Sequence, residues 1–475
     1  MSPSVEPLYY QSTRGLAPEL TFGDVLLEGL ANDGGLYVPE RWPALAVPES
    51  NAPVERPYVD VAFEVMWPFV QGSIDADAFK AIVADAYAVP AVFADEAVTP
   101  LVPMGDGSYL LELFHGPTLA FKDVALQLVG RLFDHELHAR GERVTIVGAT
   151  SGDTGSAAIE ACRDRDAIDI VILHPAGRVS EVQRRQMTTV LSPNVFNVAI
   201  DGTFDDCQDL VKAMFVDHEF RAEMQLSAVN SINWARVMAQ IVYYVVAAER
   251  LGRRKGARLA FTVPTGNFGN VFAGYAAQAM GLPISRFVVA SNRNDILTSF
   301  FNDGTMTIGE VHPTLSPSMD IQVSSNLERL LFELHEHSGA AVDSMIQRFR
   351  AQGTVSLEPR QLQRLHRHWV GARVDDDETV TTIRRVYDAH GVIIDPHTAV
   401  AVAAAGRCAA PADDPMVILA TAHPAKFPDA VERAIGIRPP LPGHMHDLLE
   451  REERVVRLAN DAEVVKAYVR SAARR

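Results

Sequence analysis

This chain of 475 residues contains few lysines and few cysteines, and it has no excess of positive charge. Its three cysteines, Cys162, Cys207 and Cys408, are odd in number and lack metal-ligand spacing, which argues against a disulfide scaffold and against a metal site. The net charge of -17 argues against a general affinity for nucleic acid or anionic membranes. No apolar stretch is long enough to span a membrane, and no hydrophobic run follows a basic N-terminal segment, so we expect a cytoplasmic protein.

Nucleotide-binding fingerprints are also missing. No GxGxxG run follows a predicted strand, and no loop ends in the Lys-Ser/Thr pair of a P-loop. Internal repeats and low-complexity segments are missing as well. With 48% hydrophobic residues, the chain has an ordinary globular composition, and its length is sufficient for two or three domains with sizeable cores.

Short β-branched runs alternate with helical sequence through most of the chain. This alternation is typical of parallel or mixed α/β sheets with helices on both faces. The predicted strands are residues 143–149, 168–174, 195–200, 259–264, 287–291 and 416–421.

The composition changes along the chain suggest four units. Residues 1–100 form an N-terminal helical module with a proline-rich connection at 39–57, and residues 101–240 form a smaller α/β domain. Residues 241–440 form a larger α/β domain, in which a strand-free helical insertion is expected near 323–390 because the sequence there is charged and helical, as in 327–337 and 359–369. Residues 441–475 are expected to be a charged helical segment on the outside.

Lys122 is one of only six lysines. It follows an apolar strand at 108–114 and a His-Gly-Pro break, and it falls in the first turn of a helix predicted at 124–137. The positive end of the helix and the apolar Leu119 and Phe121 lower the lysine pKa, whereas Asp123 raises it. A neutral amine at this place could react with an aldehyde cofactor. A surface lysine in a first helical turn explains this stretch equally well.

The loop at residues 149–156 joins a strand to a helix. Its small residues let backbone amides approach an anion, and Ser151, Thr154 and Ser156 add hydroxyl donors. A carboxylate or a phosphate would fit there. Ordinary helix capping by the same Ser, Thr and Asp residues is the alternative.

A second loop, at residues 264–270, contains two glycines and two asparagines at a helix entrance. Backbone N–H groups in such a loop can form a cup for a phosphate group. A plain turn is the alternative.

A third loop, at residues 420–427, follows a buried strand and carries Thr421, His423 and Lys426. Lys426 is the rival of Lys122 as the reactive amine. His423 precedes a proline and is expected to be a structural hydrogen-bonding residue rather than a general base.

Taken together, these motifs resemble those of a known family. Residues 115–123, HGPTLAFKD, closely resemble the cofactor-lysine motif of the threonine synthases, pyridoxal-phosphate enzymes of fold type II, the tryptophan-synthase-β-like fold. The stretches at 9–15 and 33–39 resemble the opening of the longer members of this family, which carry an extra N-terminal domain. The family's substrate loop, phosphate cup and C-terminal signature have similar stretches in the same order, at residues 151–155, 266–270 and 421–427.

The resemblance implies a role for each motif. Lys122 would bind pyridoxal 5'-phosphate covalently, Asp153 would lie by the 3'-hydroxyl of the cofactor, and Thr421 would lie by its ring nitrogen. The substrate α-carboxylate would be held by Ser151, Gly152 and Thr154. The cofactor phosphate would be held by the backbone amides of Gly266, Asn267, Phe268, Gly269 and Asn270.

The reaction implied is the conversion of O-phospho-L-homoserine and water to L-threonine and phosphate, the last step of threonine biosynthesis. Arg236, in a polar run after the strand-like segment 226–230, is the candidate for the substrate phosphate. The longer threonine synthases include monomers, so a monomer is expected. Two alternatives stay open: a serine or threonine dehydratase or other β-replacing enzyme of the same fold, and a phospholigand-binding regulator without chemistry, which would have no need of Lys122.

Overall fold

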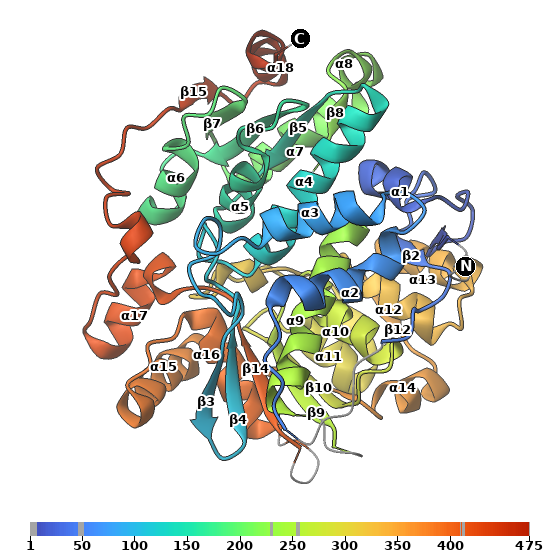
Figure 1. Ribbon diagram of the computed structural model, residues 1–475, viewed down its shortest axis with the longest axis vertical. Coiled ribbons are helices and arrows are strands. Elements are labelled where there is room, and N and C mark those ends of the chain that lie inside the picture. Colours follow the sequence, from blue (N-terminus) through green and yellow to red (C-terminus); the bar gives the residue numbers. More distant parts are fainter. Residues whose placement is uncertain are drawn as a thin grey trace.

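Two separate β-sheets form the framework of the computed structural model (Figure 1). The structure describes residues 7–45, 52–228, 231–252, 257–408, 410 and 414–474. The middle of the proline-rich connection, 46–51, and the end of the strand-like segment, 229–230, lie outside the described residues. Within the described ranges, no helix has both the length and the apolar character that crossing a membrane requires.

The smaller sheet has five parallel strands in the order β15-β7-β6-β5-β8. Four of them come from the middle of the chain and β15 comes from its end. The strands are β5 (Val144–Ala149), β6 (Ile168–Pro175), β7 (Val195–Asp201), β8 (Leu226–Ser227) and β15 (Val456–Ala459). The neighbouring helices are α4 (Lys122–Arg140), α5 (Asp153–Cys162), α6 (Glu181–Thr188), α7 (Phe204–Val216), α8 (His218–Glu223) and α18 (Ala462–Ala472).

The larger sheet has six strands in the order β13-β10-β9-β14-β4-β3. Only the edge pair β3–β4 is antiparallel, so this sheet is mixed. The strands are β3 (Leu101–Gly105), β4 (Ser108–Glu112), β9 (Leu259–Pro264), β10 (Ile284–Ser291), β13 (Trp369–Arg373) and β14 (Met416–Ala420). Its helices include α9 (Trp234–Leu251), α10 (Gly269–Ala279), α11 (Ile296–Asp303), α15 (Asp376–His390), α16 (Pro396–Arg407) and α17 (Pro428–Ile435).

The N-terminal module packs against both halves of the molecule through one continuous apolar core. Tyr10 and Trp42 place their rings on Trp234, at the start of α9, and the Tyr10 hydroxyl donates to the Phe69 carbonyl at 2.7 Å. The module consists of the antiparallel pair β1 (Tyr10–Ser12) and β2 (Tyr37–Pro39) with helices α1 (Phe22–Glu28), α2 (Tyr58–Val70) and α3 (Ala76–Ala86).

The expectation of a strand-free insertion near 323–390 is wrong. The region contains helices α12 (Leu327–Leu334), α13 (Gly339–Gln352) and α14 (Pro359–Leu365), but Trp369, predicted as helical, begins strand β13. Strand β13 pairs in parallel with β10, and a short strand β12 (Thr354–Ser356) pairs with β11 (Thr305–Thr307). Both strands are short and their hydrogen-bonding partners are distant in sequence, so local periodicity missed them.

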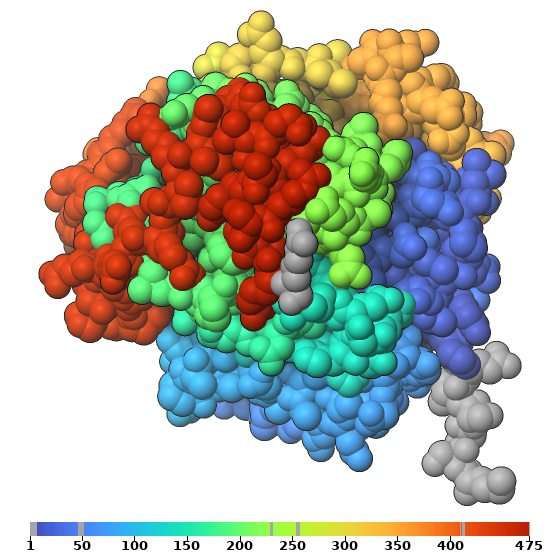
Figure 2. All heavy atoms as spheres, turned by 90° about the horizontal axis from the view of Figure 1, so that it is seen from above, coloured from blue at the N-terminus to red at the C-terminus, as the bar shows by residue number. Residues whose placement is uncertain are grey.

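The expectation of an all-helical C-terminus is also wrong, because β15 forms the edge of the smaller sheet beside β7. Its residues are mostly exposed and include Arg457, which pairs with Asp201 across the edge, so the usual apolar alternation of a strand is absent. Figure 2 shows the C-terminal segment, in dark red, lying against the green residues of the smaller sheet. The Arg454 guanidinium donates to the Ser192 and Val195 carbonyls there.

Each of the two large sheets contains strands from more than one of the four predicted units. Strands β3 and β4, in the unit predicted at 101–240, lie in the larger sheet, and β15, in the unit 441–475, lies in the smaller one. The division of the chain into independent domains stays a prediction.

Helices α4 and α5 pack very closely, and each begins with a polar residue, Lys122 and Asp153 respectively. The close approach depends on Gly130 in α4, where an added Cβ would lie 2.2 Å from the Ala161 carbonyl oxygen. The packing of these helices therefore sets the distance between Lys122 and Asp153.

We predict that Gly130→Ala destabilises the protein by about 1–3 kcal/mol, because the methyl group must push α4 away from α5. Denaturant unfolding measures this change. Gly406→Ala, also in a helix but with open space around its Cβ, is the matched control and should be neutral or slightly stabilising. Equal stability of Gly130→Ala and the wild type would contradict the close packing.

Candidate active site

A pocket lies where loops that follow β5, β9 and β14 meet the first turns of α4, α9 and α16. It contains about 700 Å³ of unfilled space, part of it open to solvent. Its lining includes Lys122, Asp153, Thr154, Arg236, Gly266, Asn267, Phe268, Gly269, Asn270, Ser318, His397 and Thr421. The structure therefore brings together most of the residues selected from the sequence.

Lys122 is the first residue of α4 and only 9% exposed. Its Nζ donates to Asp153 Oδ2 at 3.1 Å. Burial lowers the pKa of Lys122, and nearby Lys426 and Arg236 add to the effect, which outweighs the attraction of Asp153. The predicted direction is confirmed, but Asp123 does not provide the expected opposition, since its carboxylate instead accepts from the Thr118 amide and hydroxyl.

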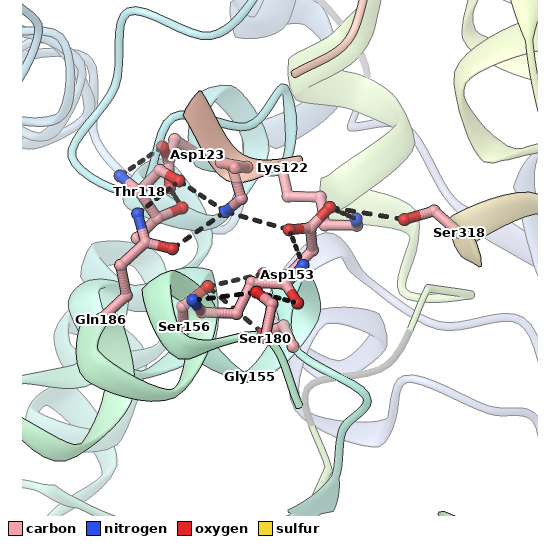
Figure 3. A network of polar contacts seen from close by, with 12 residues as sticks. Thr118, Lys122, Asp123, Asp153, Gly155, Ser156, Ser180, Gln186 and Ser318 are labelled. Atoms are coloured by element: carbon pink, nitrogen blue, oxygen red, sulfur yellow. Dashed lines mark hydrogen bonds and ion pairs between the residues drawn. The ribbon is translucent and has the colours of Figure 1, made fainter. Parts of the chain in front are cut away.

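Asp153 is the first residue of α5 and a centre of polar contacts (Figure 3). Its Oδ1 accepts from Gln183 Nε2 at 2.9 Å and pairs with Lys426 Nζ at 2.9 Å. Its Oδ2 accepts from Lys122 and, at 3.3 Å, from Ser318 Oγ. Burial alone would raise the pKa of this carboxyl, but Lys122 and Lys426 hold it well below its usual range.

The predicted phosphate cup, residues 266–270, is a rigid loop that ends in the first turn of α10. Phe268 has a left-handed backbone, φ 62, and its ring is buried against Phe301 and Trp369. The Ser324 hydroxyl donates to the Gly266 carbonyl at 2.6 Å. Because α10 begins at Gly269, its first N–H groups have no partner within the helix and can bind an anion.

Two side chains in this pocket have buried donors without an acceptor. Arg236 Nε and Nη1 and Asn270 Nδ2 have no hydrogen-bond partner among the described residues. Burial lowers the pKa of Arg236 to about 10, so this side chain is still a cation at neutral pH. Buried donors in native proteins are almost always satisfied, so their presence beside the cup indicates a site for an anion.

The predicted carboxylate loop reaches the pocket only in part. Thr154 lies in the lining, but Ser151 is exposed and, like Gly152, is not among the lining residues. The Gly152 amide donates to Thr150 Oγ1 at 3.0 Å, and an added Cβ on Gly152 would meet the Gln183 side chain. The proposed binding of a carboxylate by Ser151 and Gly152 stays a prediction.

The third loop contributes Thr421 and Lys426 to this region. Thr421 lines the pocket, and its carbonyl accepts from the Phe121 amide at 2.9 Å, which ties the loop to the start of α4. His423 Nδ1 accepts from the Ala425 amide at 3.2 Å, which confirms its expected structural contact.

His397 is a pocket residue that sequence reasoning missed. Its Nδ1 lies 2.7 Å from Asp395 Oδ2, and its Nε2 accepts from the Ser318 amide at 3.2 Å. The Asp-Pro pair before it is a recognisable helix start, with Asp395 as the N-cap and Pro396 in the first turn. Only the fold shows that this helix begins at the pocket.

These features fit a pyridoxal phosphate. A buried amine with a lowered pKa is available for an aldehyde, and helix N–H groups with the free donors of Arg236 and Asn270 are available for a phosphate. Because Gly266 has no side chain, the Ser318 backbone can lie directly against the cup; an added Cβ would lie 2.9 Å from the Ser318 carbonyl oxygen.

We predict that His423 makes stability depend on pH. Burial, and after it His115, lowers the pKa of His423 to about 4. The unfolded chain binds this proton near pH 6.5. Stability is therefore full above pH 6.5 and falls, by up to about 3 kcal/mol, as the pH drops toward 4. Unfolding free energies measured across this window should show a weaker slope for His423→Asn, which keeps an acceptor for Ala425. If the unfolding free energy of His423→Asn changes with pH as steeply as that of the wild type, His423 is not the source of the pH dependence.

Comparison with known proteins gives the family. Models of the threonine synthase N-terminus, the pyridoxal-phosphate-dependent enzymes and the threonine synthase C-terminus match residues 9–87, 92–346 and 398–469. The chain is 56% identical to the threonine synthase of Pseudomonas aeruginosa, over 97% of each chain, and 41% identical to that of Saccharomyces cerevisiae, over 90% of this chain and 89% of the yeast one. The crystal structure of a PLP-bound threonine synthase from Brucella melitensis superposes with a TM-score of 0.94 at 49% identity, covering 98% of this chain and 100% of that one. The chain belongs to the threonine synthase family of pyridoxal-phosphate-dependent enzymes.

Proposed function

We propose that this chain converts O-phospho-L-homoserine and water to L-threonine and phosphate, with the residue roles that follow. The observation that carries the proposal is the joint presence in one pocket of a buried lysine with a lowered pKa and a buried arginine, two of whose donors have no partner among the described residues. The first suits attachment of an aldehyde, and the second suits a phosphate group.

Lys122 holds pyridoxal phosphate and moves protons. When bound, the cofactor supplies an electron sink for carbanions next to the amino group of the substrate. Lys122 Nζ is held at the pocket by the start of α4, where as a free amine it would take protons from the α and β carbons of the substrate. Its lowered pKa favours the neutral amine, which is the form that can accept a proton.

The remaining polar residues position the ligands. The amides of residues 266–270 hold the cofactor phosphate. Asp153 would lie by the 3'-hydroxyl and Thr421 by the ring nitrogen, where a hydroxyl would stabilise a protonated ring less than a carboxylate. Thr154, with Ser151 and Gly152, takes the substrate carboxylate, and Arg236 takes the substrate phosphate.

The finer expectations on assembly and location also stay proposals. A monomer is proposed from the resemblance to the longer threonine synthases. A cytoplasmic location is proposed as expected above, and the absence of a nucleic-acid partner is supported by the net charge of -17.

We predict that Lys122→Ala abolishes both the yellow colour of the protein and the release of phosphate from O-phospho-L-homoserine, because no other amine replaces the Lys122 Nζ. Absorbance spectra and a phosphate assay measure the two effects. Lys212→Ala, which removes an exposed lysine of α7, is the control and should change neither. A wild-type protein that stays colourless after addition of pyridoxal phosphate would sink the proposal.

We predict that Arg236→Met lowers kcat/KM for O-phospho-L-homoserine by about 100-fold, since a charge-assisted contact to a phosphate contributes about 2–3 kcal/mol. Steady-state kinetics at saturating cofactor measure the change, and the cofactor dissociation constant is measured in parallel. If the variant binds the cofactor more weakly while its substrate kinetics are unchanged, Arg236 binds the cofactor phosphate and not the substrate phosphate. Turnover of serine or threonine in place of the phosphorylated substrate would favour the dehydratase alternative.

A further inference from the structure

Lys426 is fully buried, 0% exposed, yet its ammonium has three acceptors. Its Nζ lies 2.6 Å from the Thr118 carbonyl oxygen, 3.0 Å from Gln186 Oε1 and 2.9 Å from Asp153 Oδ1. An ammonium has three N–H donors, so each donor has one acceptor. The surroundings of Lys426 therefore match the charged form of a lysine.

Lys122 has a much poorer set of partners. Its Nζ has one acceptor among the described residues, Asp153 Oδ2 at 3.1 Å. The two lysines thus share a single carboxylate, one on each oxygen, while Gln183 and Ser318 complete its hydrogen bonds. Figure 3 shows Lys122 and Ser318 beside Asp153.

Charge balance separates the two lysines. If both were ammonium ions, two cations would share the single carboxylate of Asp153 beside the Arg236 cation, which is costly away from water. If only one is charged, these direct contacts are balanced, and the lysine with three acceptors is the better place for the proton. That lysine is Lys426.

We propose that Lys426 is a positioning residue, the fixed counter-ion of Asp153, and that by neutralising this carboxylate it leaves the amine of Lys122 free to attack an aldehyde. The proposal rests on the function proposed above and assigns a task to a residue of the C-terminal signature that the reaction itself does not use. It also gives Gln186 and the Thr118 carbonyl a task, because they hold Lys426 in place.

Other charged groups face this cluster. The Asp123 carboxylate accepts from the Thr118 amide and hydroxyl while Lys426 donates to the Thr118 carbonyl, and Lys426 opposes the burial that raises the pKa of Asp123 to about 6. Asp395 pairs with His397 at 2.7 Å, and Ser318 joins His397 to Asp153 through its amide and its hydroxyl. Arg236 acts on Lys122 in the same direction as Lys426, because both are cations. Since Asp153 contacts both lysines directly, loss of Lys426 should reach Lys122 mainly through Asp153.

The test is the pH dependence of cofactor attachment. Apoprotein is mixed with pyridoxal phosphate at a series of pH values, the yellow absorbance band is followed with time, and borohydride reduction with peptide mapping identifies the lysine that is modified. In Lys426→Met, Lys122 is the remaining lysine on the Asp153 carboxylate, so its ammonium form is more stable. The pH at which the attachment rate reaches half its maximum, the midpoint, should therefore rise by about 1 pH unit or more, and attachment at neutral pH should slow about tenfold.

Two further variants separate charge from structure. Asp153→Asn with Lys426→Met removes both charges and should bring the midpoint back toward the wild-type value, which a purely structural role of Lys426 would not do. Asp153→Asn alone should lower the midpoint, and this keeps the proposal testable if Lys426→Met does not fold. Lys466→Met, which removes a lysine paired with Asp217 at 2.7 Å, is the control and should leave the midpoint unchanged.

The outcomes distinguish this proposal from the function on which it rests. A folded Lys426→Met protein that attaches the cofactor at Lys122 with the wild-type midpoint would overturn the role of Lys426 alone. Attachment at a lysine other than Lys122 in the wild type would overturn the function proposed above.

Discussion

The buried carboxylate of Asp153 is the contact on which the rest of the site depends. It joins the first turn of α5 to Lys122 on α4, to Ser318 before the insertion and to Lys426 near the C-terminus. Two of these elements are the helices α4 and α5 beside the smaller sheet, and the other two follow strands β11 and β14. A single ion network therefore joins segments that come from four parts of the chain.

The second anchor is the aromatic packing behind the phosphate cup. A left-handed backbone at Phe268 is unfavourable for a bulky residue, at a cost of about 1–2 kcal/mol, and it persists here because the ring is buried against Phe301 and Trp369. The apolar core thus fixes a loop whose own hydrogen-bonding groups face the pocket. Burial of the Phe268 ring therefore stabilises the loop conformation that directs these N–H donors to the pocket.

Much of this architecture could be predicted from the sequence where the signal is local. The six predicted parallel-sheet strands are all present, and Lys122 lies in the first turn of a helix as expected. Strands β13 and β15 were missed because each is defined by hydrogen bonds to a distant partner rather than by its own alternation. His397 was missed for the same reason, since its helix start is visible in the sequence but the pocket that it faces is not.

The same distinction applies to the two lysines. Scarcity and position at a helix start marked Lys122, and Lys426 stood out as its rival. What separates them is the number of acceptors around each Nζ, three against one, and these come from residues 118, 153 and 186, which only the fold brings together. The identity of a reactive group can thus be read locally, while its protonation depends on long-range contacts.

The position of β15 has a consequence for synthesis of the chain. Until residues 456–459 have left the ribosome, β7 is an open edge strand whose backbone groups lack their final partner. The fixed partner of Asp153, Lys426, also arrives late, after nearly nine-tenths of the chain. The site is therefore completed late in synthesis, and a chain that lacks its end has an uncovered sheet edge and an Asp153 carboxylate whose only lysine partner among the described residues is Lys122.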